Sequence, residues 1–317
     1  MTVLFQNIAI IGFGLIGSSL ARAIREHGLA DRITGIDRDE EVCKKLMELE
    51  LADAATTSCA DGVKDADLVI LSVPVGAYES VARDMAPHLK QGAVITDVGS
   101  VKQTAVDSVQ PHLPEHVSFI PGHPIAGTEN SGPESGFSTL FKGRWTILTP
   151  LESSPLKDVE QVTKLWEACG ADIEIMDAKR HDLVLAITSH LPHLIAYTIV
   201  GTATDLEEHT KNDVIKFSAS GFRDFTRIAA SDPVMWRDIF LNNKDAVLEI
   251  VQRFNEDLTA LQRAIRWDDG DYLQDVFTRT RAIKRQVIEA GQSDYPTANK
   301  SDSTMPIEAA PKKASGS

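Results

Sequence analysis

Near the start of the chain stands the segment Ile8-Ala9-Ile10-Ile11-Gly12-Phe13-Gly14-Leu15-Ile16-Gly17. Its four apolar residues predict a buried strand, its three glycines have the spacing GxGxxG, and a helical pattern follows over about 16–27. In such a unit the first glycine makes a tight turn, the second lets the backbone approach a pyrophosphate, and the third lets the helix pack on the strand. The helix N-terminus adds N–H donors for the phosphates. The stretch therefore predicts a dinucleotide site at Gly12, Phe13, Gly14, Leu15, Ile16 and Gly17.

The acidic residue that such a site needs is Asp37, which ends a second predicted strand 20 residues after Gly17. A carboxylate there accepts a hydrogen bond from a ribose 2′-hydroxyl and repels a 2′-phosphate, so NAD is expected in preference to NADP. Arg38 is an adjacent cation that softens this preference. We also expect Ser72, Val73 and Pro74, at the end of a third strand, to form one wall of the nicotinamide pocket. The alternatives are a glycine turn that binds no nucleotide and a plain strand terminus at Ser72.

The first half of the chain alternates short apolar runs with helical patterns. Continuous rather than alternating apolar runs predict a parallel sheet covered on both faces, which is an α/β fold. Later strands of the same sheet are expected at 117–120, 145–148 and 173–175, with a helix over about 155–168 between the last two. Further strands are expected at 33–36, 68–73 and 93–97.

The second half reads as helices only, over 179–204, 234–264 and 270–290, with apolar residues at helical spacing. From Gly291 the composition shifts to Ser, Thr, Pro, Ala and Lys, which is typical of a disordered tail. We therefore expect a nucleotide-binding domain over 1–177, an all-α domain over 178–290 and a disordered tail over 291–317.

Composition limits the possible functions. The 317 residues give a prior of about two domains, and the net charge of −14 argues against binding to nucleic acid or an anionic membrane. Three widely spaced cysteines favour neither a disulfide framework nor a structural zinc site. No targeting segment is visible, and the most apolar window, 183–203, is interrupted by His190, Pro192 and His193. A cytoplasmic protein is expected.

Two segments carry candidate chemistry in the first half. Asp97-Val98-Gly99-Ser100-Val101-Lys102 follows a strand, and 122–132, GHPIAGTENSG, reads as a shaped loop. Pro124 restricts the backbone of His123, which suits an imidazole held in one direction. A fixed histidine beside a dinucleotide suggests hydride transfer with His123 as proton acceptor; the alternative is a structural histidine.

The helical half contributes Ser189-His190-Leu191-Pro192-His193, with Asp182 three turns before His193. A metal pair at His190 and His193 is conceivable, but metal-binding helices usually use i, i+4 spacing with a carboxylate, so no metal is expected. Further on, Arg227 is a candidate two-pronged clamp for a carboxylate, with Trp236 packed beside it. The alternative for Arg227 is a surface ion pair.

Together, the glycine motif with Asp37, 97–102, 123–132, 189–193 and 221–227 resemble the prephenate/arogenate dehydrogenase family over about residues 5–290. The resemblance implies a Rossmann-type domain followed by an all-helical dimerisation domain. It also implies a homodimer and oxidative decarboxylation of prephenate, arogenate or both with NAD or NADP. By its motifs His123 would be the catalytic histidine and Ser100 would help to bind the ring hydroxyl. His193 and Arg227 would bind substrate, Asp182 would orient Arg227, and Thr128 and Glu129 would shape the pocket and contact the neighbouring subunit.

Two other readings compete with this one. Another NAD-dependent dehydrogenase of the same layout, acting on a β-hydroxy acid, usually carries a catalytic Lys or Asn on a helix after the sheet, and no such signal stands out. A non-catalytic NAD-binding regulator would be expected to lack one of His123, Ser100 or Arg227, and all three are present.

Overall fold

The computed structural model describes residues 3–128, 130–204, 216 and 220–289. It divides into two compact units, Met1–Gln252 and Arg253–Ser317, and the first unit holds the sheets and every described candidate site residue. The predicted tail over 291–317 and the predicted site residue Glu129 lie outside the described residues.

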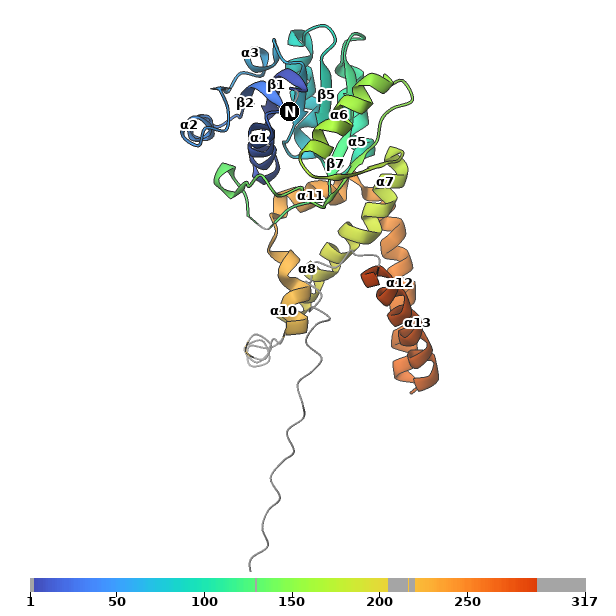
Figure 1. Ribbon diagram of the computed structural model, residues 1–317. Coiled ribbons are helices and arrows are strands. Elements are labelled where there is room, and N and C mark those ends of the chain that lie inside the picture. Colours follow the sequence, from blue (N-terminus) through green and yellow to red (C-terminus); the bar gives the residue numbers. More distant parts are fainter. Residues whose placement is uncertain (1–2, 129, 205–215, 217–219, 290–317) are drawn as a thin grey trace, which may run out of the picture. The chain divides into compact units, whose positions relative to one another are not determined.

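The core of the first unit is a parallel sheet, as the apolar runs predict, and it has six strands, one of which, at Ala54–Thr56, was not expected (Figure 1). All five pairings in it are parallel, and the order is β3-β2-β1-β4-β5-β6. The direction of winding therefore reverses between β1 and β4, where open α/β sheets bind ligands at the carboxyl ends of their strands. The strands are β1 (Phe5–Ile11), β2 (Ala30–Ile36), β3 (Ala54–Thr56), β4 (Leu68–Leu71), β5 (Val94–Asp97) and β6 (Ser118–Ile120).

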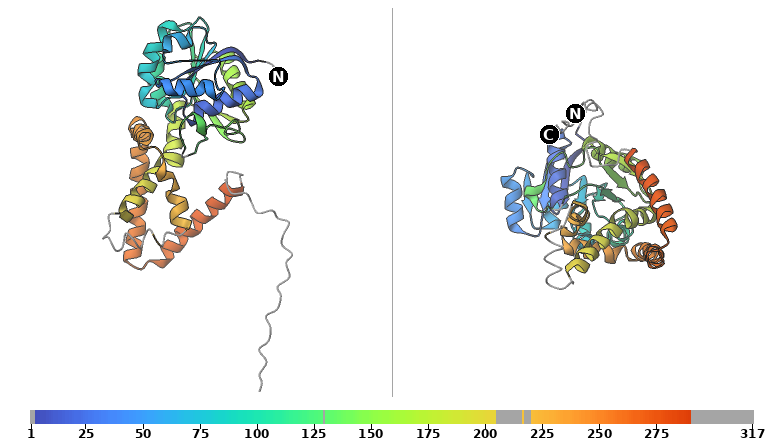
Figure 2. Two further views of the ribbon diagram at one scale, coloured as in Figure 1. Left: turned by 90° about the vertical axis from the view of Figure 1, so that its left-hand side faces the viewer. Right: turned by 90° about the horizontal axis from the view of Figure 1, so that it is seen from below.

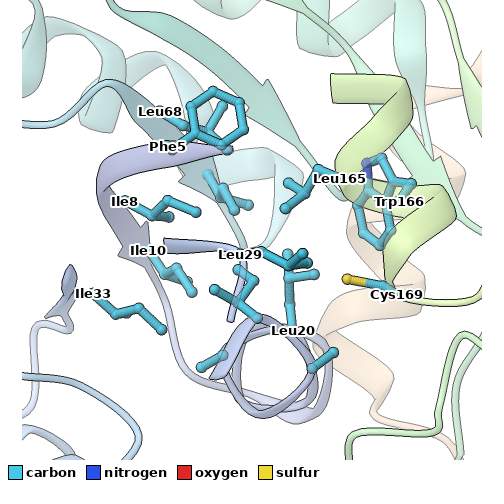
Figure 3. Packing of buried hydrophobic residues seen from close by; sticks show 14 of the residues in the cluster. Phe5, Ile8, Ile10, Leu20, Leu29, Ile33, Leu68, Leu165, Trp166 and Cys169 are labelled. Carbon is cyan, nitrogen blue, oxygen red and sulfur yellow. The ribbon is translucent and has the colours of Figure 1, made fainter. Parts of the chain in front are cut away.

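Helices cover both faces of this sheet. On one face, α1 (Leu15–His27), α2 (Glu40–Glu48) and α6 (Leu156–Ala168) contribute to one buried cluster, in which Leu20 of α1 and Leu165 and Trp166 of α6 lie near Ile8 and Ile10 (Figure 3). On the other face, residues of α3 (Cys59–Val63), α4 (Tyr78–Met85) and α5 (Lys102–Val109) pack in a second buried cluster. Because both faces of the sheet are buried, its strands are continuous apolar runs in the sequence rather than alternating ones.

A second sheet corrects the expectation that all strands join one sheet. The strands β7 (Gly122–Pro124), β8 (Trp145–Leu148) and β9 (Asp172–Ile175) form a separate three-stranded sheet in which β7 runs antiparallel to β8. Pro121 separates β6 from β7 and has no N–H to continue a ladder, while its carbonyl accepts from Thr149 N–H at 2.8 Å. His123 consequently lies in a short strand rather than in the predicted loop.

The helical part of the first unit begins with one continuous helix over Ala178–Thr204, which leads away from the sheet (Figures 1 and 2). It consists of α7 (Ala178–Leu185), a π-helical turn (Ala186–His190) and α8 (Leu191–Thr204). After α10 (Ser220–Thr226), helix α11 (Pro233–Asn242) returns to the sheet and packs Trp236 and Ile239 against Val101.

The predicted helix over 234–264 is broken at Asn243, between α11 and α12 (Lys244–Arg266). The Asn243 side chain donates to the Asp182 carbonyl at 2.8 Å and lies 3.1 Å from His190 Nδ1. Because the helix is broken there, the side-chain amide of Asn243 contacts both α7 and the π-helical turn. In the second unit a short turn, in which Asp269 N–H donates to Ala264 at 2.9 Å, leads into α13 (Gly270–Glu289).

Candidate active site

The glycine turn after β1 has the backbone geometry that only glycine tolerates. Gly12 has φ +94°, and a Cβ there would lie 2.5 Å from the Ser72 carbonyl oxygen at the end of β4. A Cβ on Gly17 would lie 2.2 Å from the Gly12 carbonyl oxygen. The first and third glycines are therefore required by the fold itself, and they bring β1, β4 and α1 together.

Gly14 has no such steric reason, since a Cβ built on it meets no atom within 4 Å. It caps α1 without a side-chain hydrogen bond, and the first turn of α1 contains no acidic residue. No side chain of the described residues caps the N–H groups of that turn, and the positive end of the helix dipole lies there. These features fit the diphosphate of a dinucleotide, which needs close backbone approach and N–H donors.

Asp37 stands beside this turn, directly after β2. Its Oδ2 accepts from Phe13 N–H at 3.1 Å and its Oδ1 from Asp39 N–H at 3.1 Å. The carboxylate is thereby fixed at the position from which a ribose hydroxyl is recognised. Arg38 next to it is exposed. Across the turn, Ser72 N–H donates to the Ile11 carbonyl at 2.7 Å, which places Ser72 at the same edge of the sheet.

A buried ion pair anchors the segment after β5. Asp97 and Lys102 are fully buried and paired, and the Lys102 ammonium also donates to the Gly122 carbonyl at 2.6 Å. Gly122 N–H returns a hydrogen bond to Asp97 Oδ1 at 3.0 Å, and the Tyr78 hydroxyl donates to Asp97 Oδ2 at 2.8 Å. Since these bonds join β5, α5 and β7, they hold the strand that carries His123.

His123 is buried, with 8% of its surface exposed. Its Nδ1 lies 2.9 Å from Nε2 of His181 on α7, and the two rings meet edge to face. Its Nε2 has no partner within the described part of the chain. Burial first, then the His181 ring and the Lys102 ammonium, hold the pKa of His123 well below the usual histidine value. At neutral pH this imidazole is uncharged and able to accept a proton.

Asp182 lies behind His181. Its Oδ1 accepts from Lys102 N–H at 2.7 Å and from His181 Nδ1 at 2.8 Å, and its Oδ2 accepts from Gln103 N–H at 2.9 Å. The carboxylate therefore caps the N-terminus of α5 and holds His181; that it also orients Arg227 stays a prediction.

The second group of residues lies around Trp236. His193 stacks on the Trp236 indole with ring centroids 3.6 Å apart, and its Nδ1 lies 2.8 Å from the Ser189 carbonyl oxygen. Arg227 begins the turn after α10 and is exposed; its charge helps to lower the pKa of His193, after the larger effect of burial, so the two side chains are near each other. His190 is fully buried, and burial lowers its pKa to about 4.

The contacts of the structure thus bring only some of the predicted site residues together. Ser100 is half-buried between β5 and α5, next to the Val101 that packs on Trp236. Thr128 is exposed, and its Oγ1 accepts from Asn130 N–H at 3.3 Å.

Sequence reasoning missed His181 and gave no role to Lys102, although both are fully buried within the site. The only signal for His181 was a His-Asp pair at the start of an otherwise apolar helix.

A glycine turn after β1 with a fixed acidic residue, and a neutral buried imidazole on the strand that follows the carboxyl end of β6, define a dinucleotide-binding dehydrogenase. Comparisons with known proteins narrow this class. Residues 20–175 match the family described as prephenate dehydrogenase, nucleotide-binding domain, and residues 177–279 match prephenate dehydrogenase, dimerization domain. The chain belongs to the prephenate dehydrogenase family.

Individual relatives agree with this assignment. The chain is 44% identical to a cyclohexadienyl dehydrogenase of Zymomonas mobilis, covering 90% of this chain and 96% of the relative. It is 35% identical to a Bacillus subtilis prephenate dehydrogenase over 86% of this chain and 74% of the relative. The crystal structure of the Aquifex aeolicus prephenate dehydrogenase, in complex with hydroxyphenyl propionate and NAD⁺, superposes with a TM-score of 0.83 at 37% identity over 89% of this chain and 98% of that one.

Proposed function

We propose that this chain catalyses the oxidative decarboxylation of prephenate, arogenate or both, with NAD as the hydride acceptor, in tyrosine biosynthesis. The observation that carries the proposal is His123, a neutral imidazole with Nε2 unpartnered among the described residues, on the strand that follows the carboxyl end of β6. The glycine turn after β1 belongs to the same unit, and the space around Gly14 is open. The family assignment supports the substrate class.

The cofactor proposal rests on the fit of the residues at the glycine turn. NAD, when bound, supplies the nicotinamide that accepts a hydride. The N–H groups at the start of α1 would hold its diphosphate, and Asp37 would accept a hydrogen bond from its ribose. Phe13, Leu15 and Ile16 supply backbone to this turn, and Ser72, Val73 and Pro74 would form the pocket wall at the end of β4. Arg38, exposed beside Asp37, is the residue that would weaken the discrimination against NADP.

The chemistry of the substrate indicates roles in proton transfer and substrate binding for the remaining residues. His123 Nε2 accepts the proton of the C4 hydroxyl while C4 gives up a hydride. The resulting dienone loses its C1 carboxylate as carbon dioxide and becomes aromatic, which makes the step effectively irreversible. The Ser100 hydroxyl would bind the ring hydroxyl. Arg227 would hold a carboxylate of the substrate, and His193 would be a second residue that donates a hydrogen bond to the substrate or accepts one from it.

We propose that the protein is a homodimer. The helix over Ala178–Thr204 is long and apolar enough, by length and composition alone, to cross a membrane. Only 22% of its most apolar 18-residue segment is buried in the single chain, so most of that segment is exposed. The first half of the helix nevertheless places His181 and Asp182 in hydrogen bonds to β7 and α5. A second copy of this chain is the partner we propose for its exposed apolar face, and this is consistent with the match to a dimerization domain. Thr128, which is exposed, would lie near that second copy.

We further propose a functional boundary at residue 177, where β9 has ended at Ile175 and α7 starts at Ala178. The nucleotide-binding domain is then 1–177 and the substrate and dimerisation domain 178–290. A cytoplasmic location is also proposed, in agreement with three free thiols, two of them buried.

The proposed function is tested with the purified full-length chain. We expect NADH and carbon dioxide to appear in equal amounts when NAD is supplied with prephenate, arogenate or both, and much slower turnover with NADP. No turnover of either substrate with either cofactor would refute the proposal, and turnover of a β-hydroxy acid instead would favour the competing dehydrogenase.

A further inference from the structure

Three buried side chains form a continuous hydrogen-bonded row behind His123. His123 Nδ1 lies 2.9 Å from His181 Nε2, and His181 Nδ1 lies 2.8 Å from Asp182 Oδ1. His181 is fully buried and Asp182 is 5% exposed. The row connects β7 with α7, two elements far apart in the sequence, and it ends at the Nε2 atom that the proposed function uses.

The direction of every hydrogen bond in this row follows from Asp182. Both of its carboxylate oxygens already accept from backbone N–H groups, those of Lys102 and Gln103 at the start of α5. The N-terminus of a helix favours the anionic carboxylate, which only accepts. His181 must therefore donate to it through Nδ1–H.

The protonation of His181 then decides that of His123. Burial lowers the pKa of His181, and the neutral ring has one proton, which Nδ1 carries. Its Nε2 is therefore an acceptor, and among the described residues the group that faces it at hydrogen-bond distance is His123 Nδ1, which must donate. The lone pair of the neutral His123 ring is left on Nε2.

We propose that His181 and Asp182 are positioning residues that fix His123 as the Nδ1-protonated tautomer and so leave Nε2 as its proton acceptor. The proposal rests on the proposed function for its catalytic consequence, but the tautomer itself is a property of the chain alone. In the absence of His181, Nδ1 and Nε2 of His123 compete for one proton, and the ring loses the contact that sets its direction.

The tautomer is measured first, by nitrogen NMR of the full-length chain labelled with ¹⁵N-histidine. The chain has nine histidines, so the signals of His123 are assigned by their loss in His123→Asn. We expect Nδ1 of His123 to show the shift of a protonated nitrogen and Nε2 that of an unprotonated one, and His181→Leu to give a mixture. The opposite tautomer in the unaltered chain would overturn the proposal whether or not the enzyme is active.

Kinetics then separate positioning from a merely structural role. His181→Leu should lower kcat by about 10-fold or more with little change in KM, since an imidazole held in the wrong tautomer costs up to about 10⁴ in a hydrogen-bonded catalytic triad. His181→Gln should restore most of kcat, because its amide oxygen can accept from Nδ1–H. Equal kcat values for His181→Leu and His181→Gln would contradict the proposal.

A double-mutant cycle with His123→Asn provides the control for folding. If His181 acts through His123, adding His181→Leu to His123→Asn should leave the residual kcat unchanged, although it lowers the unfolding temperature in both backgrounds. If instead the fold-losses of kcat from His181→Leu and from His123→Asn multiply in the double variant, His181 supports the site in another way. An inactive unaltered chain would refute the proposed function and leave the NMR result to decide the tautomer.

Discussion

Among single residues, we expect the carboxylate of Asp37 to select between NAD and NADP. It is fixed beside the glycine turn by Phe13 N–H, where a 2′-phosphate would bring like charges together, and this costs several kcal/mol. Asp37→Ser should narrow the difference in kcat/KM between NAD and NADP, chiefly by improving NADP. Arg38→Ser is the matched control and should widen the difference. Equal use of NADP by the unaltered enzyme would show that Asp37 does not read the ribose.

Arg227 carries a second prediction at this scale. Its exposed guanidinium near His193 is the proposed clamp for a substrate carboxylate. Arg227→Ala should raise KM by about 10–100-fold, equivalent to the roughly 1.5–3 kcal/mol of a hydrogen bond to a charged group, with a smaller effect on kcat. Arg227→Lys should recover only part of the loss, because an ammonium cannot make the planar two-pronged contact. An unchanged KM in Arg227→Ala would assign the carboxylate to another cation.

Single residues also show where sequence reasoning stops. His123 could be found because Pro124 and the surrounding glycines form a local pattern. The role of His181 could not, since it depends on a contact between positions 58 residues apart. Asp182 was found through its helical spacing from His193, but its hydrogen bonds to the N-terminus of α5 were not, because spacing within one helix does not reveal a contact with another helix.

At the scale of elements, the glycine turn and α1 give a matched pair of substitutions. A Cβ on Gly14 enters open space, whereas one on Gly17 meets the Gly12 carbonyl oxygen at 2.2 Å. Gly14→Ala should therefore keep the unfolding temperature but weaken NAD binding by at least about 10-fold, which is about 1.4 kcal/mol. Gly17→Ala should lower the unfolding temperature. Unchanged NAD affinity in Gly14→Ala, measured by calorimetry, would place the diphosphate elsewhere.

The strands of the large sheet were predicted except β3, whose residues Ala54–Thr56 were not recognised as a strand, and the strands of the small sheet were not assigned correctly. Apolar runs identify β8 and β9 as strands, but a run does not state which neighbour it pairs with, so both were placed in the large sheet. β7 was missed because its three residues, Gly122–Pro124, contain a glycine and a proline and show no strand pattern. The break at Asn243 was missed because its cause is a tertiary hydrogen bond to α7.

At the scale of the whole molecule, the proposed dimer predicts a mass of about twice 34.6 kDa in sedimentation. Ile187 lies on the apolar helix over 178–204 and is 49% exposed in the single chain. Ile187→Asp should therefore shift the equilibrium toward monomer without unfolding it. Leu156 on α6 is more exposed still, at 79%, and Leu156→Asp serves as the control that leaves the mass unchanged. A monomeric and active unaltered chain would contradict the dimer.

The pH profile of kcat in the unaltered enzyme and in His123→Asn shows whether His123 is the proton acceptor of this dehydrogenase. Loss of a general base costs about 10²–10⁴ in rate, so kcat of His123→Asn should fall at least about 100-fold while KM for both substrates changes little. Burial, His181, Lys102 and His190 lower the pKa of His123, so protonation occurs below the usual histidine range. The unaltered enzyme should therefore keep its rate through neutral pH and lose it only on the acid side of that range, a limb that His123→Asn lacks. A near-normal kcat in His123→Asn, or the same acid limb in its residual activity, would contradict the account.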